Sequence, residues 1–151
     1  MKKLAKILFE KNLTIACAES CTGGFLSHLL TNIPGSSRYF KGSIICYSNQ
    51  IKNEFLKVPK KILKEKGAVS LEVAKITAQN IKKLFRTHIG ISTTGVAGPS
   101  ALENKPVGTI FIGIAFKNKT KVIHLKLKGD RIKIKEKASK KALEFLYNLI
   151  K

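Results

Sequence analysis

The stretch LTIACAESCTGGFLSHLL, residues 13–30, decides how the rest of the chain is interpreted. Its apolar, β-like part ends at Ala18, and a helical pattern of apolar residues begins at Phe25. A turn of small polar residues and two glycines lies between them, and this order of strand, turn and helix is typical of α/β proteins. Such a turn can bind an anion, hold a nucleophilic hydroxyl beside backbone N–H groups, or simply cap the helix.

The remaining pattern alternates between strands and helices. We expect five strands, over residues 13–18, 43–48, 88–94, 107–116 and 120–127. We expect six helices, over residues 1–10, 25–31, 49–56, 60–66, about 70–84 and 131–150, with a loop over residues 34–40. Three strands separated by helices, then a hairpin and a last helix, predict a single α/β domain with a mostly parallel sheet and an antiparallel edge.

The charge of the chain is its most unusual bulk property. The 151 residues carry a formal net charge of +20, which could favour nucleic acid as a partner. However, only Arg38, Arg86 and Arg131 are arginines, and the lysines are scattered through every segment. Base recognition and bidentate phosphate binding favour arginine. We therefore interpret the charge as a solvated, lysine-rich surface whose attraction to nucleic acid is weak, non-specific and sensitive to salt.

The cysteines and the apolar segments indicate the compartment. Cys17, Cys21 and Cys46 are an odd number without a CxxC pair, which argues against a disulfide framework and against a zinc site, and fits a reducing cytoplasm. No apolar run reaches 18 residues, so no membrane-spanning helix is expected. The basic N-terminus has no small-residue cleavage site, so a signal peptide is not expected either.

Several common catalytic sites are disfavoured by residues that are missing or badly placed. Asp130 is the only aspartate, and a Mg²⁺-dependent phosphoryl-transfer site normally needs carboxylate ligands. His28, His88 and His124 have no i,i+4 partner and lie on none of the loops that follow the parallel strands, so we expect structural roles for them. The GxGxxG and GxxxxGKS motifs are absent, which disfavours dinucleotide and P-loop sites.

What remains is a serine, a tyrosine and a lysine at the carboxyl ends of neighbouring strands. Ser20 follows the first strand, Tyr47 ends the second, and Lys52 lies about one helical turn later. In α/β sheets ligands bind at this edge, where residues 94–98 also arrive after the third strand. A lysine whose pKa is lowered by burial can deprotonate a serine, with a tyrosine relaying the proton, for acyl transfer from an amide or ester. Spacing alone leaves open that Lys52 is a surface lysine and that Tyr47 packs at the edge of the core.

Seven stretches carry a resemblance to a known family, in family order over nearly the whole chain. They are residues 18–24, 34–42, 47–49 with Lys52, 67–70, 94–99, 105–109 and 129–131. On these motifs the sequence resembles the CinA C-terminal domain family, whose stand-alone form is nicotinamide-nucleotide amidohydrolase. The resemblance implies a three-layer α/β/α domain over residues 1–151, with a mixed, mostly parallel sheet of about five strands, that often dimerises.

The resemblance also implies a reaction and a site. The reaction is hydrolysis of nicotinamide mononucleotide to nicotinate mononucleotide and ammonia, without a metal ion or other cofactor. The family's serine nucleophile corresponds to Ser20, and its tyrosine and lysine correspond to Tyr47 and Lys52. The residues implied to bind the nucleotide are Thr22, Gly23, Ser36, Ser37, Thr94, Gly95, Ala97, Gly98 and Arg131. Arg131 is a candidate for the phosphate or a carboxylate, within one chain or across a dimer interface.

The sequence departs from the family pattern at three places. Ser100-Ala101 stands where Gly-Gly is common, Lys57 replaces a glycine, and Lys135 replaces an arginine. The first change touches a loop at the expected site and bears on the fit of the substrate. The larger N-terminal domain of full-length CinA is absent, so its pyrophosphatase activity is not expected.

Two other functions stay open, an amidase for another small amide and a non-enzymatic competence module that binds polyanions through the basic surface.

Overall fold

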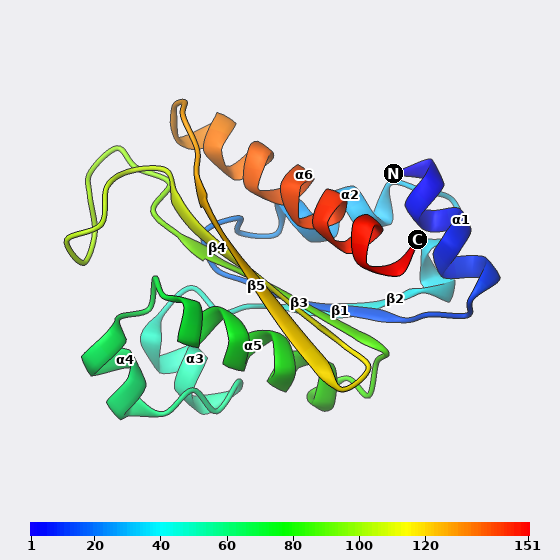
Figure 1. The fold of residues 1–151 in the computed structure, drawn as a ribbon, viewed down its shortest axis with the longest axis horizontal. Coiled ribbons are helices and arrows are strands. Elements are labelled where there is room, and N and C mark those ends of the chain that lie inside the picture. The colour runs from blue at the N-terminus through cyan, green and yellow to red at the C-terminus, as the bar shows by residue number, and fades with distance from the viewer.

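The computed structural model describes residues 1–151 and contains one five-stranded sheet (Figure 1). Its strands are β1 (Ile15–Glu19), β2 (Phe40–Ile45), β3 (Ile89–Gly95), β4 (Thr109–Phe116) and β5 (Lys119–Lys126). They lie in the order β2-β1-β3-β4-β5. The β2-β1-β3 pairings are parallel and the β3-β4-β5 pairings are antiparallel. Only β4 therefore runs against the other four strands, which confirms the mixed, mostly parallel sheet.

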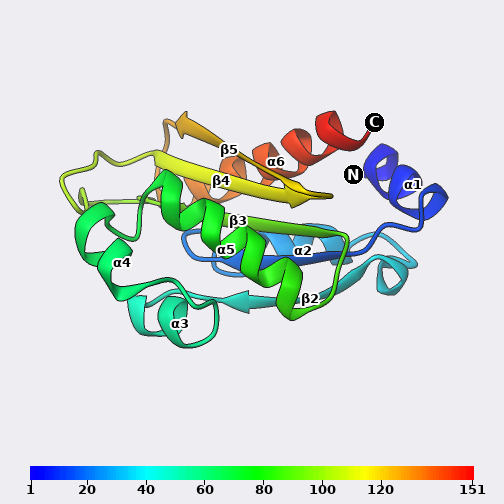
Figure 2. The same cartoon turned by 60° about the horizontal axis from the view of Figure 1, so that its bottom comes forward.

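Helices cover both faces of this sheet (Figures 1 and 2). On one face lie α1 (Lys2–Glu10), α2 (Phe25–Thr31) and α6 (Arg131–Ile150), and on the other lie α3 (Asn49–Glu54), α4 (Lys60–Lys66) and α5 (Leu71–Leu84). A core cluster of 21 buried residues fills the first interface and one of nine residues fills the second. The result is the expected α/β/α sandwich, and it buries β1 and β3 on both faces.

Local capping explains where the long helices begin. The Ser70 hydroxyl accepts a hydrogen bond from the Val73 N–H and caps the start of α5. The Asp130 carboxylate does the same for the Lys133 N–H and starts α6. The bounds of α2, α4 and α6 coincide with those predicted from the apolar pattern. Leu84 falls near the same helical face as Val73 and Ile81 in the apolar pattern, but it is 54% exposed at the end of α5.

The second strand differs from its predicted position. It spans Phe40–Ile45 rather than residues 43–48, because the register shifts at its start, where Ile15 pairs with Phe40 and Ala16 pairs with Gly42. Lys41 is the extra residue and forms a β-bulge. The next residue, Gly42, has no side chain that would clash with the nearby Phe85 ring. After Ile45 the chain leaves the sheet, and this departure creates the wall of the site described below.

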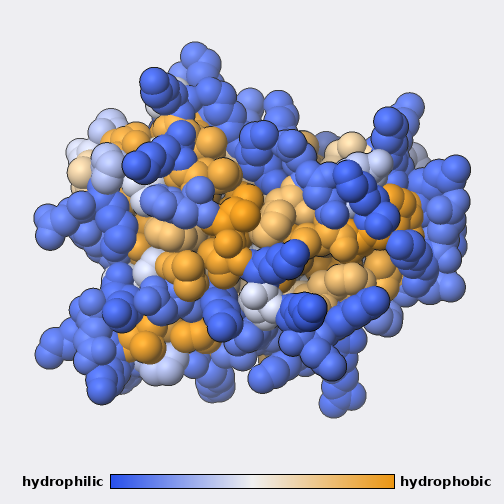
Figure 3. Space-filling view, in the orientation of Figure 1, coloured by the Kyte–Doolittle hydropathy of each residue, from blue (hydrophilic) through white to orange (hydrophobic).

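The surface is dominated by hydrophilic side chains that project around the periphery, with apolar side chains gathered across the middle of one face (Figure 3). All six ion pairs involve side chains that are at least 25% exposed. Exposed pairs of this kind contribute little to stability. No helix combines the length and the apolar character that crossing a membrane requires.

Candidate active site

The turn after β1 is organised by a buried carboxylate. Glu19 is fully buried, and its side chain accepts five hydrogen bonds. Oε2 accepts from the Thr22 hydroxyl (2.6 Å), the Gly24 N–H (2.9 Å) and the Leu26 N–H (3.1 Å). Oε1 accepts from the N–H (2.8 Å) and the hydroxyl (2.5 Å) of Ser27. Glu19 thereby fixes the turn to the first residues of α2.

This arrangement decides between the interpretations of the turn. The N–H groups at the start of α2 donate to Glu19, so they are not free to hold an external anion. Thr22 is fully buried and also bonds the Thr93 hydroxyl at 2.8 Å. Gly23 has a left-handed φ of 56°. Neither Thr22 nor Gly23 lines the cavity beside the turn. They shape the turn that presents Ser20.

A cavity of about 440 Å³ opens where the parallel strands end. It collects segments that follow β1, β2 and β3, together with the start of α6, as the topology predicts. Its lining residues are Ser20, Cys21, Tyr47, Asn49, Lys52, Ala68, Val69, Thr94, Gly95, Val96, Ala97, Gly98, Pro99, Ser100, Ala101, Leu102, Glu103 and Arg131.

Ser20 and Lys52 form a buried pair in this cavity. The Lys52 Nζ lies 3.0 Å from the Ser20 Oγ, and the two residues are 1% and 9% exposed. The same Nζ donates to the carbonyls of Cys46 (2.6 Å) and Tyr47 (3.3 Å), which face it because β2 ends at Ile45. The ammonium form can donate to all three oxygens, whereas a neutral amine has two N–H donors for the carbonyls and a lone pair that can accept from the serine hydroxyl.

Burial lowers the pKa of Lys52 below its usual value of 10.5, because the charged ammonium loses its water. No carboxylate lies within ion-pair distance of Lys52. The shift is toward the neutral amine needed to accept a proton, and the more distant Glu103 charge opposes it. Burial has the opposite consequence for the neighbouring thiol, because it raises the pKa of Cys21 to about 12 and keeps the sulfur protonated. Ser20 is thus the better placed nucleophile.

One backbone N–H group in the turn after Ser20 is free of a protein acceptor and belongs to a residue that lines the cavity. The Ser20 N–H itself donates to the Thr93 carbonyl (3.0 Å), and the Gly23 N–H donates to the Ser20 carbonyl (3.1 Å). The N–H groups of Cys21 and Thr22, between them in the turn, donate to no protein acceptor. Cys21 lines the cavity, so its N–H is the nearest candidate donor for a developing negative charge.

Tyr47 and Arg131 meet at the mouth of the cavity. The Arg131 guanidinium donates to the Tyr47 hydroxyl (2.9 Å) and to the Gly98 carbonyl. Tyr47 is 61% exposed, and its hydroxyl contacts neither Ser20 nor Lys52. The structure therefore brings Tyr47 to the cavity, but it places the hydroxyl where it bonds Arg131 rather than where it could relay a proton between the serine and the lysine.

The other residues implied by the family resemblance fall into two groups. Thr94, Gly95, Ala97 and Gly98 line the cavity, and the Thr94 hydroxyl donates to the Ala68 carbonyl (2.7 Å). Ser36 and Ser37 lie in the short 3₁₀ turn before β2, at the edge of the sheet where the parallel strands begin. They do not line this cavity. The family motif of residues 34–42 does not show whether these serines lie at the carboxyl or the amino ends of the parallel strands.

Sequence reasoning missed two acidic residues. Glu19 has no role in the sequence-based prediction, although a glutamate directly after an apolar run and before a turn of small residues was a signal that could have drawn attention to it. Glu103, which lines the cavity, was not considered, because nothing in its local sequence distinguishes it from a surface glutamate.

The histidines have structural partners, as expected. The His88 Nδ1 lies 2.9 Å from the Thr14 hydroxyl, and the His124 ring stacks on Phe111 with 4.5 Å between centroids. No group of three or more histidine, cysteine, aspartate or glutamate side chains is arranged to hold a metal ion. The three cysteines are buried and free.

Comparisons with known proteins agree with this fold. Competence-damage inducible proteins of Bacillus mycoides and Bacillus cereus are 46% and 47% identical over 146 residues, which is 96% of this chain and 35% of the length of each relative. The chain thus spans about a third of these relatives. The competence damage-inducible protein A of Klebsiella pneumoniae has a crystal structure that matches with a TM-score of 0.95 at 27% identity, covering 97% of this chain and 92% of that one.

A second solved structure shows the same likeness. The competence/damage inducible protein CihA of Agrobacterium tumefaciens matches with a TM-score of 0.93 at 29% identity, covering 99% of this chain and 94% of that one. The family model described as the CinA C-terminal domain matches residues 1–150, almost the entire chain. With this match added to the sheet order and the close relatives, the chain belongs to the CinA C-terminal domain family.

Proposed function

We propose that the chain is an amidohydrolase that converts nicotinamide mononucleotide to nicotinate mononucleotide and ammonia, with Ser20 as the nucleophile and Lys52 as the general base. The observation that carries the proposal is the buried contact of 3.0 Å between the Lys52 Nζ and the Ser20 Oγ inside a cavity. A serine is a weak nucleophile at neutral pH unless a neighbouring base accepts its proton, and the buried amine supplies that base.

The reaction follows from these positions in two steps. The Ser20 Oγ attacks the amide carbon while Lys52 takes its proton, and the N–H of Cys21 stabilises the oxyanion. Lys52 then gives the proton to the departing nitrogen, the C–N bond breaks, and ammonia leaves an ester on Ser20. In the second step Lys52 deprotonates a water molecule that attacks this ester, and the proton returns to the Ser20 Oγ as the carboxylic acid is released.

The choice of a nucleotide amide rests on the family resemblance and on the mouth of the cavity. Arg131 is at the first position of α6 and lines the cavity, so its guanidinium can pair with a phosphate. A cavity of about 440 Å³ is within the usual range for sites that bind small molecules. In this proposal Tyr47 holds Arg131 in place instead of acting as a proton relay.

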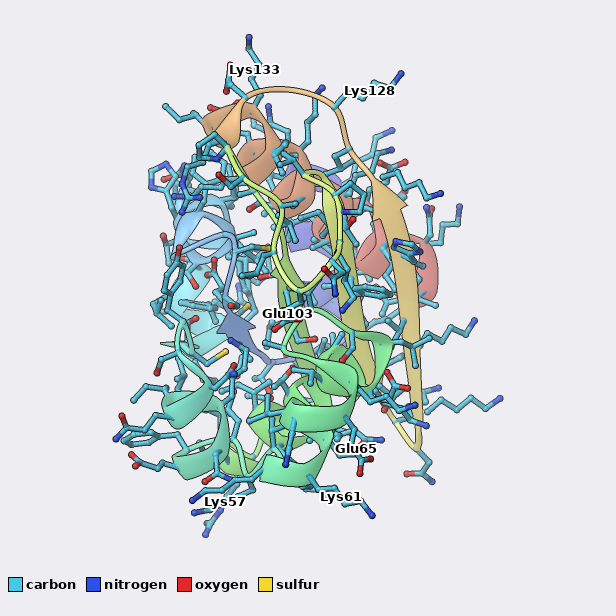
Figure 4. The ribbon with its side chains drawn as sticks, turned by 90° about the vertical axis from the view of Figure 1, so that its left-hand side faces the viewer. Lys57, Lys61, Glu65, Glu103, Lys128 and Lys133 are labelled. Atoms are coloured by element: carbon cyan, nitrogen blue, oxygen red, sulfur yellow. The ribbon has the colours of Figure 1, made fainter.

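The test is ammonia release from nicotinamide mononucleotide and from a panel of other small amides. We expect Ser20→Ala and Lys52→Met to lose at least about a thousandfold in kcat/KM, because each removes part of one catalytic unit. The matched control is Lys61→Met, since Lys61 has a side chain that is 79% exposed and points away from the cavity (Figure 4). Equal activity of Ser20→Ala and wild type would refute the proposed function.

The two other functions give different results in the same experiment. An amidase for another substrate would release ammonia from a different member of the panel, with the same dependence on Ser20. A polyanion-binding module would release none, and would bind DNA with a steep salt dependence that Ser20→Ala leaves unchanged.

A further inference from the structure

Glu103 is the only acidic side chain that lines the candidate active site. The basic side chains of the lining are Lys52, whose pKa burial shifts toward the neutral amine, and Arg131, which stays a cation. Glu103 lies in the connection between β3 and β4. Viewed toward the carboxyl ends of the parallel strands, it lies near the middle of the molecule, whereas Lys57 and Lys128 extend at the periphery (Figure 4). A single carboxylate thus stands in a cavity whose permanent cation is Arg131.

Two backbone N–H groups and a glycine hold this carboxylate in place. Its two oxygens accept hydrogen bonds from the Ala68 N–H (2.9 Å) and the Val69 N–H (3.0 Å). A side chain on Gly67 would overlap the carboxylate, so the glycine leaves the space that it needs. Glu103 and Asn104 both adopt a left-handed backbone, with φ values of 53° and 56°, a conformation that is unfavourable for a residue other than glycine. The position of the charge is therefore fixed by the surrounding backbone.

These hydrogen bonds do not neutralise the negative charge of Glu103. Backbone N–H groups carry no net charge, and each carboxylate oxygen keeps a lone pair beyond the one that they use. The nearest cation, the Lys105 Nζ, is 3.5 Å from Oε2, and its side chain is 28% exposed, so water screens this pair. The Glu103 side chain is itself 25% exposed. Glu103 can thus still attract a positive charge inside the cavity.

We propose that Glu103 is a specificity-determining residue that selects an amide attached to a cationic ring, such as an N-substituted pyridinium, over a neutral amide of the same shape. This inference rests on the proposed function. The pyridinium ring carries its positive charge close to the amide, and it must enter a cavity in which Arg131 is positive and repels it. Glu103 is the only group of the lining whose charge offsets this repulsion.

A purely structural role for Glu103 makes a different prediction. As a clamp between the 67–69 segment and the β3–β4 connection, it would hold the cavity in shape for every ligand alike. Its loss would then weaken cationic and neutral ligands by the same factor. The ratio of the two affinities separates a charge effect from a shape effect.

The experiment measures binding of two matched ligands to the Ser20→Ala variant, which cannot turn them over. The ligands are nicotinamide mononucleotide, with a cationic ring, and its reduced form, whose dihydropyridine ring is neutral while the amide, ribose and phosphate are unchanged. We expect the cationic form to bind more tightly in calorimetry. We expect this preference to fall about fivefold in Ser20→Ala/Glu103→Gln, the upper end of what is expected when a partly exposed ion pair is lost.

Two further variants make the test independent of folding defects. Glu72→Gln removes a carboxylate at the start of α5 that lies 3.9 Å from Lys66 and does not line the cavity, and it should leave the preference unchanged. Lys105→Met removes the screened partner of Glu103 and should maintain or increase the preference. If Glu103→Gln leaves the ratio of affinities unchanged, or if Lys105→Met lowers it, the inference is wrong.

Ammonia release by wild type with an unchanged ratio would overturn the inference and leave the proposed function standing, whereas absence of ammonia would overturn the proposed function itself.

Discussion

Glu19→Gln should destabilise the protein strongly, although the substitution changes only one atom of the side chain. The Glu19 carboxylate has five hydrogen-bond donors around it and is fully buried. A glutamine can place its oxygen where Oε2 lies and keep the Thr22, Gly24 and Leu26 donors. Its NH₂ group then faces the N–H of Ser27, so a donor meets a donor.

The size of the loss follows from these contacts. Each bond to a neutral oxygen is weaker by about 1 kcal/mol than the bond to a carboxylate, and three bonds are affected. The unpaired Ser27 N–H adds about 1–3 kcal/mol. Removal of a buried charge returns part of this cost, because the glutamine no longer has to be desolvated as an ion. We expect a net loss of about 3 kcal/mol in the free energy of unfolding, which corresponds to a fall of about 10 °C in Tm for a domain of this size.

Urea unfolding followed by circular dichroism measures this loss, with a thermal melt as a second readout. The matched control is Glu10→Gln, whose side chain is 59% exposed and lies 3.7 Å from Lys6, and which should change the free energy by less than about 0.5 kcal/mol. If Glu19→Gln costs less than about 1 kcal/mol, the buried carboxylate does not hold the Ser20 turn and the argument from its five donors is refuted.

Two further predictions concern the proposed reaction. Because burial lowers the pKa of Lys52 and only the neutral amine can act as the base, kcat/KM should rise with pH through a pKa below 10.5, and a pH–rate profile that is flat or falls over this limb would contradict the assignment. Tyr47→Phe removes only the hydroxyl that accepts from Arg131, so kcat/KM should fall about threefold to tenfold in steady-state assays. A loss as large as that of Lys52→Met would instead support a proton relay through Tyr47.

Local sequence patterns were sufficient for most of the secondary structure. Ser70 and Asp130 cap the helices that follow them, and this information is contained in a few neighbouring residues. The buried strand β4 is an apolar run from Ile110 to Phe116, and its hairpin partner β5 largely alternates between exposed and half-buried residues. The second strand was misplaced because its start depends on a register shift against β1, which is a property of two strands and cannot be read from one.

The candidate site was only partly predictable for the same reason. The order of strands and helices placed the segments after β1, β2 and β3 at one edge of the sheet, and the cavity lies there. That order could not place Ser36 and Ser37, which precede β2 and lie at the opposite edge. It also could not show that the Tyr47 hydroxyl bonds Arg131, since these residues are 84 positions apart.

The sequence by itself determined the helices, the strands and the family motifs, because these depend on neighbouring residues. It also placed Ser20 in a turn between a strand and a helix. The tertiary structure decided that Lys52 is buried against that serine, 32 positions away, whereas most other lysines lie at the surface. It decided as well that Glu19 occupies the N–H groups that could have bound an anion. Burial, and with it the pKa of an amine or the availability of an N–H group, arises only when distant segments pack together, and no single stretch of the chain contains that information.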